Sequence, residues 1–255
     1  MNENEKYFEL KNLTKNFGGL RAVDNLSFSM EKNMVTGLIG PNGAGKTTTF
    51  NLISGFLQPE AGKIYFKNRD ITGLPPHEVA KLGIARTFQD LRLFNKLTTL
   101  ENVLLGMQDR RGESLWEAVT GGRRVNQSVK KDLERGMNLL DLVGLCDKAE
   151  ELVENLAYGE QKLLALARLL ASDADLLMLD EPTSGLPLGT VDEMLQLIRN
   201  LVKQGKTTLV IEHNMEAVMG ISDWIIVLNF GGIIASGRPE QIQKNEDVIK
   251  IYLGL

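Results

Sequence analysis

The sequence has few residues that form crosslinks or bind metals: its 255 residues include one cysteine, Cys146, and two histidines. A lone cysteine excludes an intramolecular disulfide, and so few cysteines and histidines exclude a typical structural zinc cage. Basic residues are not in excess, because 29 lysines and arginines stand against 33 acidic residues, giving a net charge of −4. The chain therefore has no global positive field to hold a phosphodiester backbone, and we expect no nucleic-acid partner.

Long apolar runs are missing as well. The longest run near the C-terminus, from Trp224 to Ala235, spans 12 residues and contains Asn229 and two glycines. A helix that crosses a bilayer needs about 20 apolar residues. The N-terminal residues lack the apolar segment of a signal peptide. We therefore expect the chain to stay on the side of the membrane where it is made and to reach the membrane only through a partner.

The composition that remains is that of a globular protein, with 43% apolar and 24% charged residues. The sequence shows no internal repeat, and its length suits one large domain, or one domain with a subdomain. Apolar runs separated by helix-length segments predict a buried parallel sheet. The expected strands of this sheet are Leu176–Leu179, Thr207–Ile211 and Ile225–Leu228. The apolar run Val35–Ile39 predicts a further strand in the first third of the chain, before a glycine-rich turn and a helix.

The middle of the chain has a helical pattern. Apolar residues recur every three or four positions from Thr98 to about Ala171, with a loop or short turn expected over Arg110–Asn126 because glycines and polar residues gather there. We therefore predict a single α/β domain over residues 1–255, with a helical subdomain at about 90–171 inserted into the α/β core.

Residues 40–47 read Gly-Pro-Asn-Gly-Ala-Gly-Lys-Thr and match the phosphate-binding pattern G-x-x-x-x-G-K-[ST], between an apolar run and a helix-compatible segment. In this pattern the backbone N–H groups converge on phosphate oxygens, Lys46 reaches the terminal phosphates and Thr47 offers its hydroxyl to Mg²⁺. The sequence therefore predicts a nucleoside triphosphate site. Its candidate residues are Gly40, Asn42, Gly43, Ala44, Gly45, Lys46, Thr47 and Thr48.

Two carboxylates, Asp180 and Glu181, follow the apolar run Leu176–Leu179. Open α/β sheets bind ligands at the carboxyl ends of their strands, so both acids are expected beside the phosphate loop. Asp180 is the expected Mg²⁺ partner, and Glu181 is placed to polarise the water that attacks the γ-phosphate. The alternative is an acidic strand end that caps a following helix.

With these motifs the chain resembles an ABC-type ATPase subunit over nearly its whole length. Residues 155–161, Asn-Leu-Ala-Tyr-Gly-Glu-Gln, resemble the ABC signature. Gln89 in Arg-Thr-Phe-Gln resembles the Q-loop glutamine, His213 the switch histidine, and Phe17 the aromatic residue that stacks on adenine. The resemblance implies a P-loop fold of ABC type, with a mostly parallel core sheet, an antiparallel β part and a helical subdomain.

The resemblance also implies roles for these residues. Glu181 and His213 are catalytic, and Gln89 joins Thr47 and Asp180 around Mg²⁺ and the γ-phosphate. The signature positions that bind ATP are Ala157, Gly159 and Glu160. In the family, signature and P-loop serve one ATP from opposite protomers, so the resemblance implies a head-to-tail dimer that closes on ATP and Mg²⁺.

The chain differs from the residues usual in the family at three positions. Ala157 stands where a serine is usual, Glu160 where a glutamine is usual, and Pro187 where Asp or Asn is usual. An anion at position 160 is expected to point away from the phosphates. The sequence leaves the effect of these departures on the hydrolysis rate open.

The chain resembles ATPases of branched-chain amino-acid importers most specifically in five short segments: Phe17–Leu20, Arg86–Gln89, Ala157–Gly159, Val218–Asp223 and Asp247–Gly254. The implied partners are membrane permease subunits, a second ATPase subunit and, indirectly, a substrate-binding protein. The implied location is peripheral, on the cytoplasmic face of the cell membrane. Three alternatives stay open: the ATPase of a lipopolysaccharide-type exporter, a nucleotide-gated clamp with little hydrolysis, and a soluble repair or translation ATPase. The cargo and the choice between homodimer and heterodimer also stay open.

Overall fold

The computed structural model describes residues 7–107 and 123–253. The chain divides into two compact units. The first comprises residues 1–86, 175–184 and 191–255, and the second comprises residues 87–174 and 185–190. The inserted helical subdomain was expected at about 90–171, within the longer segment of the second unit.

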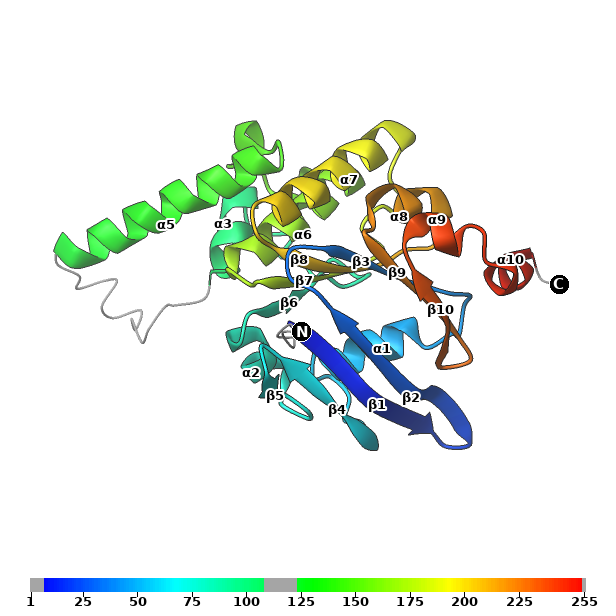
Figure 1. Cartoon of the computed structure of the whole chain (residues 1–255). Helices are drawn as coiled ribbons and strands as arrows, with labels where there is room; N and C mark the ends of the chain where they lie inside the picture. The colour runs from blue at the N-terminus through cyan, green and yellow to red at the C-terminus, as the bar shows by residue number, and fades with distance from the viewer. Residues whose placement is uncertain (1–6, 108–122, 254–255) are drawn as a thin grey trace. The chain divides into compact units, whose positions relative to one another are not determined.

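A six-stranded sheet forms the centre of the first unit, with the order β10-β9-β3-β8-β7-β6 (Figure 1). Its strands are β3 (Val35–Ile39), β6 (Ile84–Arg86), β7 (Leu176–Asp180), β8 (Thr207–Ile211), β9 (Trp224–Asn229) and β10 (Gly232–Gly237). All neighbours pair in parallel except β10, which is antiparallel to β9. Strands β3, β7 and β8 are buried along their full length, which is why they read as continuous apolar runs.

A four-stranded antiparallel sheet, in the order β2-β1-β4-β5, forms the other sheet of this unit (Figure 1). Its strands are β1 (Phe8–Phe17), β2 (Leu20–Met30), β4 (Ala61–Phe66) and β5 (Arg69–Asp70). Apolar side chains of both sheets share one core, for example Phe8 and Leu10 of the antiparallel sheet with Leu38 and Leu209 of the parallel one. Phe50 of α1 joins the same core and is fully buried.

Helices accompany the two sheets of the first unit, and two of them, α9 and α10, form its C-terminal end. They are α1 (Lys46–Ile53), α2 (Pro76–Lys81), α8 (Met215–Ile221), α9 (Pro239–Ile242), α10 (Glu246–Leu253) and most of α7 (Leu188–Lys203). Among the helices that the structure describes, none combines the length and the apolar character needed to cross a membrane.

The second unit is helical. Its elements are α3 (Thr99–Leu105), α5 (Arg123–Leu142), α6 (Tyr158–Ala171) and the short 3₁₀ turns η1 (Cys146–Lys148) and η2 (Val153–Asn155). Helix α3 packs against both α5 and α6. A reciprocal cap starts α3, because the Thr98 hydroxyl accepts from the Glu101 N–H at 3.2 Å and the Glu101 carboxylate accepts from the Thr98 N–H at 2.7 Å.

The predicted fold class is confirmed: a mostly parallel sheet, an antiparallel β part and a helical region are all present. One local prediction was wrong at its end. The loop expected over Arg110–Asn126 lies mostly outside the described residues, but Arg123–Asn126 are already helical in α5. None of residues 123–126 is a glycine or a proline, so nothing in this end of the expected loop opposes a helix.

Candidate nucleotide site

The phosphate loop joins β3 to α1 and is built on glycines that no other residue can replace without strain. Gly40 has a φ of 150°, and a Cβ there would lie 2.2 Å from the Leu228 carbonyl oxygen. Gly45 has a φ of 100°, and its Cβ would lie 2.4 Å from the Ala22 carbonyl oxygen. Both glycines therefore allow a left-handed backbone and a close approach of neighbouring strands, so that the loop curls ahead of the helix N-terminus.

The same loop is tied to a distant turn. The Gly231 N–H, in the turn between β9 and β10, donates to the Ala44 carbonyl at 3.1 Å. The Gly231 carbonyl in turn accepts from the Asp24 N–H at 2.9 Å, so the turn is bonded to both β2 and the loop. The phosphate loop is thus held in place by two segments far from it in sequence.

Lys46, the first residue of α1, is folded onto its own loop and is 6% exposed. Its Nζ donates to the carbonyls of Gly40 and Pro41 at 2.7 and 2.9 Å. Burial lowers the pKa of Lys46, and the carboxylates of Glu181 and Asp180 oppose that lowering. The two acids are therefore close enough to act electrostatically on the lysine, as the sequence predicts for groups around one phosphate chain. Thr47, which follows it, is exposed.

Asp180 ends β7 and is buried, 8% exposed. One of its oxygens accepts from the Arg86 guanidinium at 2.7 Å. Glu181 follows with a φ of 50°, a left-handed conformation uncommon for a residue with a side chain. Its N–H donates to the Ile211 carbonyl at 2.9 Å, and His213 Nε2 lies 2.9 Å from Glu181 Oε1. The structure thus brings the two predicted catalytic side chains into hydrogen-bonding contact.

Glu212 was not singled out in the sequence, although it stands between Ile211 and His213. It is 3% exposed, and its Oε1 accepts from both the N–H and the hydroxyl of Thr183, each at 2.7 Å. The segment after β8 is thereby bonded to the segment that carries Glu181. The feature of the sequence that could have pointed to Glu212 is its position directly before His213, a candidate catalytic residue.

Phe17 lies at the end of β1 and is 48% exposed. The ammonium group of Lys15 lies 5.6 Å from the centre of its ring. An exposed aromatic ring beside a cation offers a flat surface for stacking, whereas a core phenylalanine would be enclosed.

The remaining predicted residues belong to the second unit. Gln89 is exposed, in the segment after β6. Ala157 precedes α6, and the Glu160 carboxylate turns back to accept from the Ala157 N–H at 2.9 Å and from Lys148 Nζ at 2.6 Å. These two bonds, with Lys148 the stronger influence, lower the pKa of Glu160. The N–H of Gly159 belongs to the first turn of the same helix, where backbone donors lack intrahelical partners.

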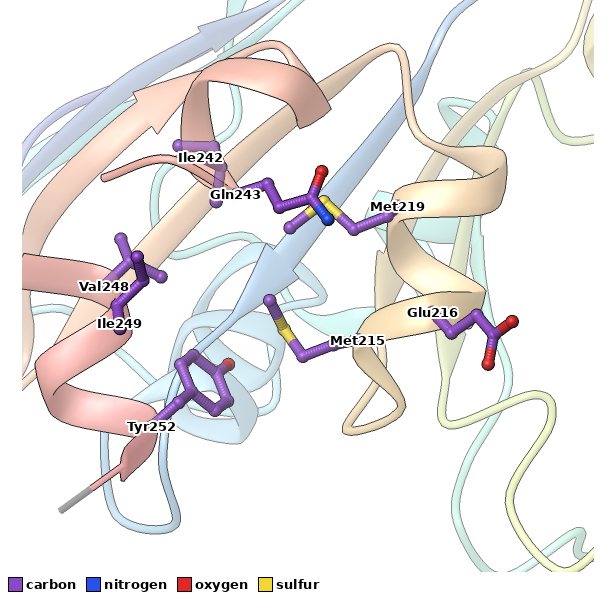
Figure 2. A pocket seen from close by; sticks show the side chains of 8 residues that line it. All are labelled: Met215, Glu216, Met219, Ile242, Gln243, Val248, Ile249 and Tyr252. Carbon is purple, nitrogen blue, oxygen red and sulfur yellow. The ribbon is translucent and has the colours of Figure 1, made fainter. Parts of the chain in front are cut away.

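A cavity of about 480 Å³ lies in the first unit near the C-terminal helix (Figure 2). Apolar side chains from α8, α9 and α10 dominate its lining, with Met215 and Tyr252 on facing sides, and the Glu216 carboxylate points away from it. The lining residues are Met215, Glu216, Met219, Ile242, Gln243, Val248, Ile249 and Tyr252.

Tyr252, on the C-terminal helix α10, also contacts the phosphate loop. Burial raises the pKa of Tyr252, and a hydrogen bond with the backbone of Gly40 opposes the rise. The C-terminal helix therefore reaches the start of the phosphate loop.

Comparison with protein families gives two matches. Residues 23–184 match the family model described as ABC transporter, and residues 233–254 match one described as branched-chain amino acid ATP-binding cassette transporter.

Similar proteins include the high-affinity branched-chain amino acid transport ATP-binding protein LivG of Salmonella typhimurium, 42% identical over 95% of each chain. The corresponding protein BraF of Pseudomonas aeruginosa is 41% identical over 96% of this chain and 97% of its own.

Solved structures agree with these matches. A nucleotide-free ATP-binding cassette from an ABC transporter superposes with a TM-score of 0.85 at 32% identity, covering 98% of this chain and 100% of the other. A dimeric bacterial ABC transporter cassette gives a TM-score of 0.77 at 27% identity, covering 91% and 98%. Together with the P-loop and the Glu181–His213 pair, these matches show that the chain belongs to the ABC transporter family and is one of its ATP-binding ATPase subunits.

Proposed function

We propose that this ATPase hydrolyses MgATP to drive the import of branched-chain amino acids through a membrane permease, as one of two ATPase subunits on the cytoplasmic face of the membrane. The observation that carries its chemistry is the Glu181–His213 contact of 2.9 Å. Both residues follow parallel strands, β7 and β8, and β8 lies next to β3, from which the phosphate loop emerges. The carboxyl ends of these strands meet at one edge of the sheet.

In this mechanism Glu181 orients the attacking water and accepts its proton, while His213 keeps the carboxylate in one direction. The left-handed backbone of Glu181 is fixed by its N–H bond to the Ile211 carbonyl. Lys46 exchanges a carbonyl partner of its own loop for a phosphate oxygen, to which an ammonium bonds more strongly. The backbone donors and the positive end of α1 favour the same anion.

The residues present fit Mg²⁺. Hard cations of this size take oxygen ligands, and Mg²⁺ is usually held by one or two protein groups together with the phosphates. In the first unit the hydroxyl of Thr47 and the carboxylate of Asp180 are the oxygens that we propose for the ion. Gln89 belongs to the second unit, and its role as a ligand stays a prediction from the family resemblance. When bound, the ion neutralises charge that develops on the phosphate oxygens.

Adenine is proposed to stack on Phe17, whose ring is exposed for it. Ala157, Gly159 and Glu160 are proposed to serve the ATP of the opposite protomer, through the N-terminal backbone donors of α6. Because the Glu160 carboxylate is held by Lys148 and by the Ala157 N–H, its negative charge is partly neutralised within its own chain. Dimeric cassettes among the similar structures support this arrangement.

The permease is proposed to dock on the segment from Gln89 to about Gly106. Its first part, residues 89–97, carries four large apolar residues, of which Phe94 is 54% exposed while Leu91, Leu93 and Leu97 are half-buried. Buried Asn102 holds the backbone of Phe94 at both its N–H, 2.9 Å, and its carbonyl, 3.1 Å. A rigid segment with an exposed aromatic side chain suits a short amphipathic helix of a membrane partner.

Cross-linking tests this docking. In a Cys146→Ser background, which removes the exposed native thiol, Phe94→Cys should cross-link to the permease. Val129→Cys on α5, which is similarly exposed at 48%, is the matched control and should not cross-link. Cross-links from position 129 alone would contradict the proposed surface.

Two findings support branched-chain amino acids as the cargo. The similar transport proteins carry that name, and residues 233–254 match a family model specific to such transporters. Native pull-down from membranes should recover permease subunits and a second ATPase subunit. Vesicles with the recovered complex should take up radiolabelled leucine in an ATP-dependent manner, and a complex carrying Glu181→Gln should not. Recovery of lipopolysaccharide-transport subunits without leucine uptake would refute the import proposal.

A further inference from the structure

Arg86 is a buried cation to which neither the sequence motifs nor the family comparison assigns a task. It ends β6, three residues before Gln89 in the chain. Its side chain is 6% exposed and that of its partner Asp180 is 7% exposed. Arginine is almost never this buried unless it is paired, because removing a charge from water carries a large desolvation penalty.

The guanidinium joins three elements of the first unit. Its Nη2 donates to Asp180 Oδ2 at 2.7 Å, at the end of β7. Its Nη1 donates to the Asn51 side-chain oxygen at 2.6 Å, on α1, and the Ser54 hydroxyl lies 3.4 Å away. The ring of Phe50, also on α1, lies 5.2 Å from the guanidinium carbon. Asp180 is therefore linked through one planar group to the helix that starts at the phosphate loop.

This geometry restricts how Asp180 turns. A carboxylate at a strand end rotates about its side-chain bonds unless a neighbour restrains it, and here Arg86 Nη2 donates to one of its oxygens, Oδ2. The two-armed guanidinium fork is itself fixed, because Nη1 donates to Asn51 and the group packs against Phe50, so it does not follow the carboxylate. Partners of this kind, one shell out from a metal, orient the ligand, and their loss typically lowers metal affinity 10–100-fold.

We propose that Arg86 is a positioning residue for the ATPase reaction: it holds the Asp180 carboxylate in the direction from which that carboxylate meets Mg²⁺, and it ties that direction to α1. The proposal rests on the Mg²⁺ role proposed above for Asp180. Arg86 touches neither the nucleotide nor the ion in this assignment and acts through Asp180 alone.

The test is the affinity for a fluorescent ADP analogue, measured with excess Mg²⁺ and again with EDTA. The ratio of the two affinities isolates the contribution of the ion, and it needs no turnover. In Arg86→Gln we expect affinity in EDTA within twofold of wild type and a Mg²⁺-dependent gain at least ~10-fold smaller. Arg86→Lys should recover part of the gain, because a single ammonium keeps the charge and loses the fork.

Two controls separate the possible failures. Arg199→Gln removes an arginine of the same unit that bonds the Gly220 carbonyl, and it should leave the ratio unchanged. Asp180→Asn should abolish the gain. An intact gain in Asp180→Asn would refute the Mg²⁺ assignment, and the role of Arg86 with it. An intact gain in Arg86→Gln alongside a lost gain in Asp180→Asn would refute Arg86 alone.

A merely structural role is also distinguishable. It predicts that Arg86→Gln loses affinity equally in Mg²⁺ and in EDTA, and that outcome would overturn the proposal. If Arg86→Gln does not fold, Arg86→Lys decides the question. A single ammonium group lacks the two separate N–H arms with which the guanidinium bonds Asp180 and Asn51. A gain in Arg86→Lys equal to that of wild type would then overturn the proposal.

Discussion

Replacing Thr183 by valine tests whether the contacts around Glu212 position the catalytic carboxylate. Valine has nearly the same shape as threonine, so the substitution removes the hydroxyl and leaves the packing of a side chain that is 5% exposed. It deletes the bond from the Thr183 hydroxyl to Glu212 Oε1, 2.7 Å, and keeps the bond from the Thr183 N–H. The buried Glu212 carboxylate then has one fewer donor.

The expected magnitude follows from that bond. A hydrogen bond to a charged group contributes about 1.5–3 kcal/mol, so the free energy of unfolding should fall by about 2 kcal/mol. For a protein of this size, 1 kcal/mol corresponds to roughly 2–4 °C, and the melting temperature should fall by about 4–8 °C. Glu212 precedes His213 in the chain, so a Glu212 carboxylate that is held less firmly should also loosen the Glu181–His213 pair. We expect kcat to fall ~3–10-fold and KM to stay within twofold.

Melting temperature and steady-state hydrolysis, measured on the same preparations below the lower melting temperature, provide the assay. Thr183→Ser is the matched control: it keeps the hydroxyl and loses one methyl group, at a cost of about 0.8 kcal/mol. Its kcat should stay near that of wild type. Equal losses of kcat in Thr183→Ser and Thr183→Val would refute the argument, because the bond to Glu212 would then not be what positions the site.

Three further predictions concern the phosphate loop, the dimer and pH. Lys46→Ala should lose at least ~100-fold in ATP affinity by calorimetry, because the phosphates lose their ammonium partner, while the melting temperature changes little; wild-type affinity would remove Lys46 from its role. Pro187→Asn should leave ATP binding to the isolated chain unchanged and raise hydrolysis by the assembled complex ~3–10-fold, since an amide restores a hydrogen-bonding group before α7; an unchanged rate would contradict this. Glu160→Gln should unfold at lower urea concentration at pH 7, and the difference should shrink as the pH falls below 4.5 through the lowered pKa of Glu160, because protonation removes the same charge; a difference that does not shrink at all below pH 4.5 would exclude the charge as its cause.

The sequence predicted the phosphate loop and the buried strands because their signals are local. The match over residues 40–47 needs only eight consecutive residues, and a strand buried on both faces is a continuous apolar run wherever it lies. The placement of Asp180 and Glu181 required one more step, the rule that parallel strands gather their carboxyl ends. These predictions depend on covalent order and on general packing rules.

The contacts that hold the site were beyond such reasoning. Arg86 and Asp180 are 94 positions apart, and Thr183 and Glu212 are 29 apart. Nothing in the local sequence Arg-Thr-Phe-Gln, residues 86–89, distinguishes a buried guanidinium from a solvated one. Which of many charged residues form pairs depends on strand register, here Arg86 opposite Met178, and register follows from the packing of the whole sheet.

Gly231 shows how far the mutational sensitivity of the phosphate loop extends. A Cβ at this position, where φ is 81°, would lie 3.0 Å from the Ala22 carbonyl oxygen, and its N–H and carbonyl bond Ala44 and Asp24. A saturation screen scored on ATP binding should therefore find intolerant positions in a hairpin, β9–β10, that contains none of the predicted nucleotide-binding residues. Variants found at these positions in a transport-deficient strain should be attributed to impaired ATP binding, as variants in the phosphate loop itself are.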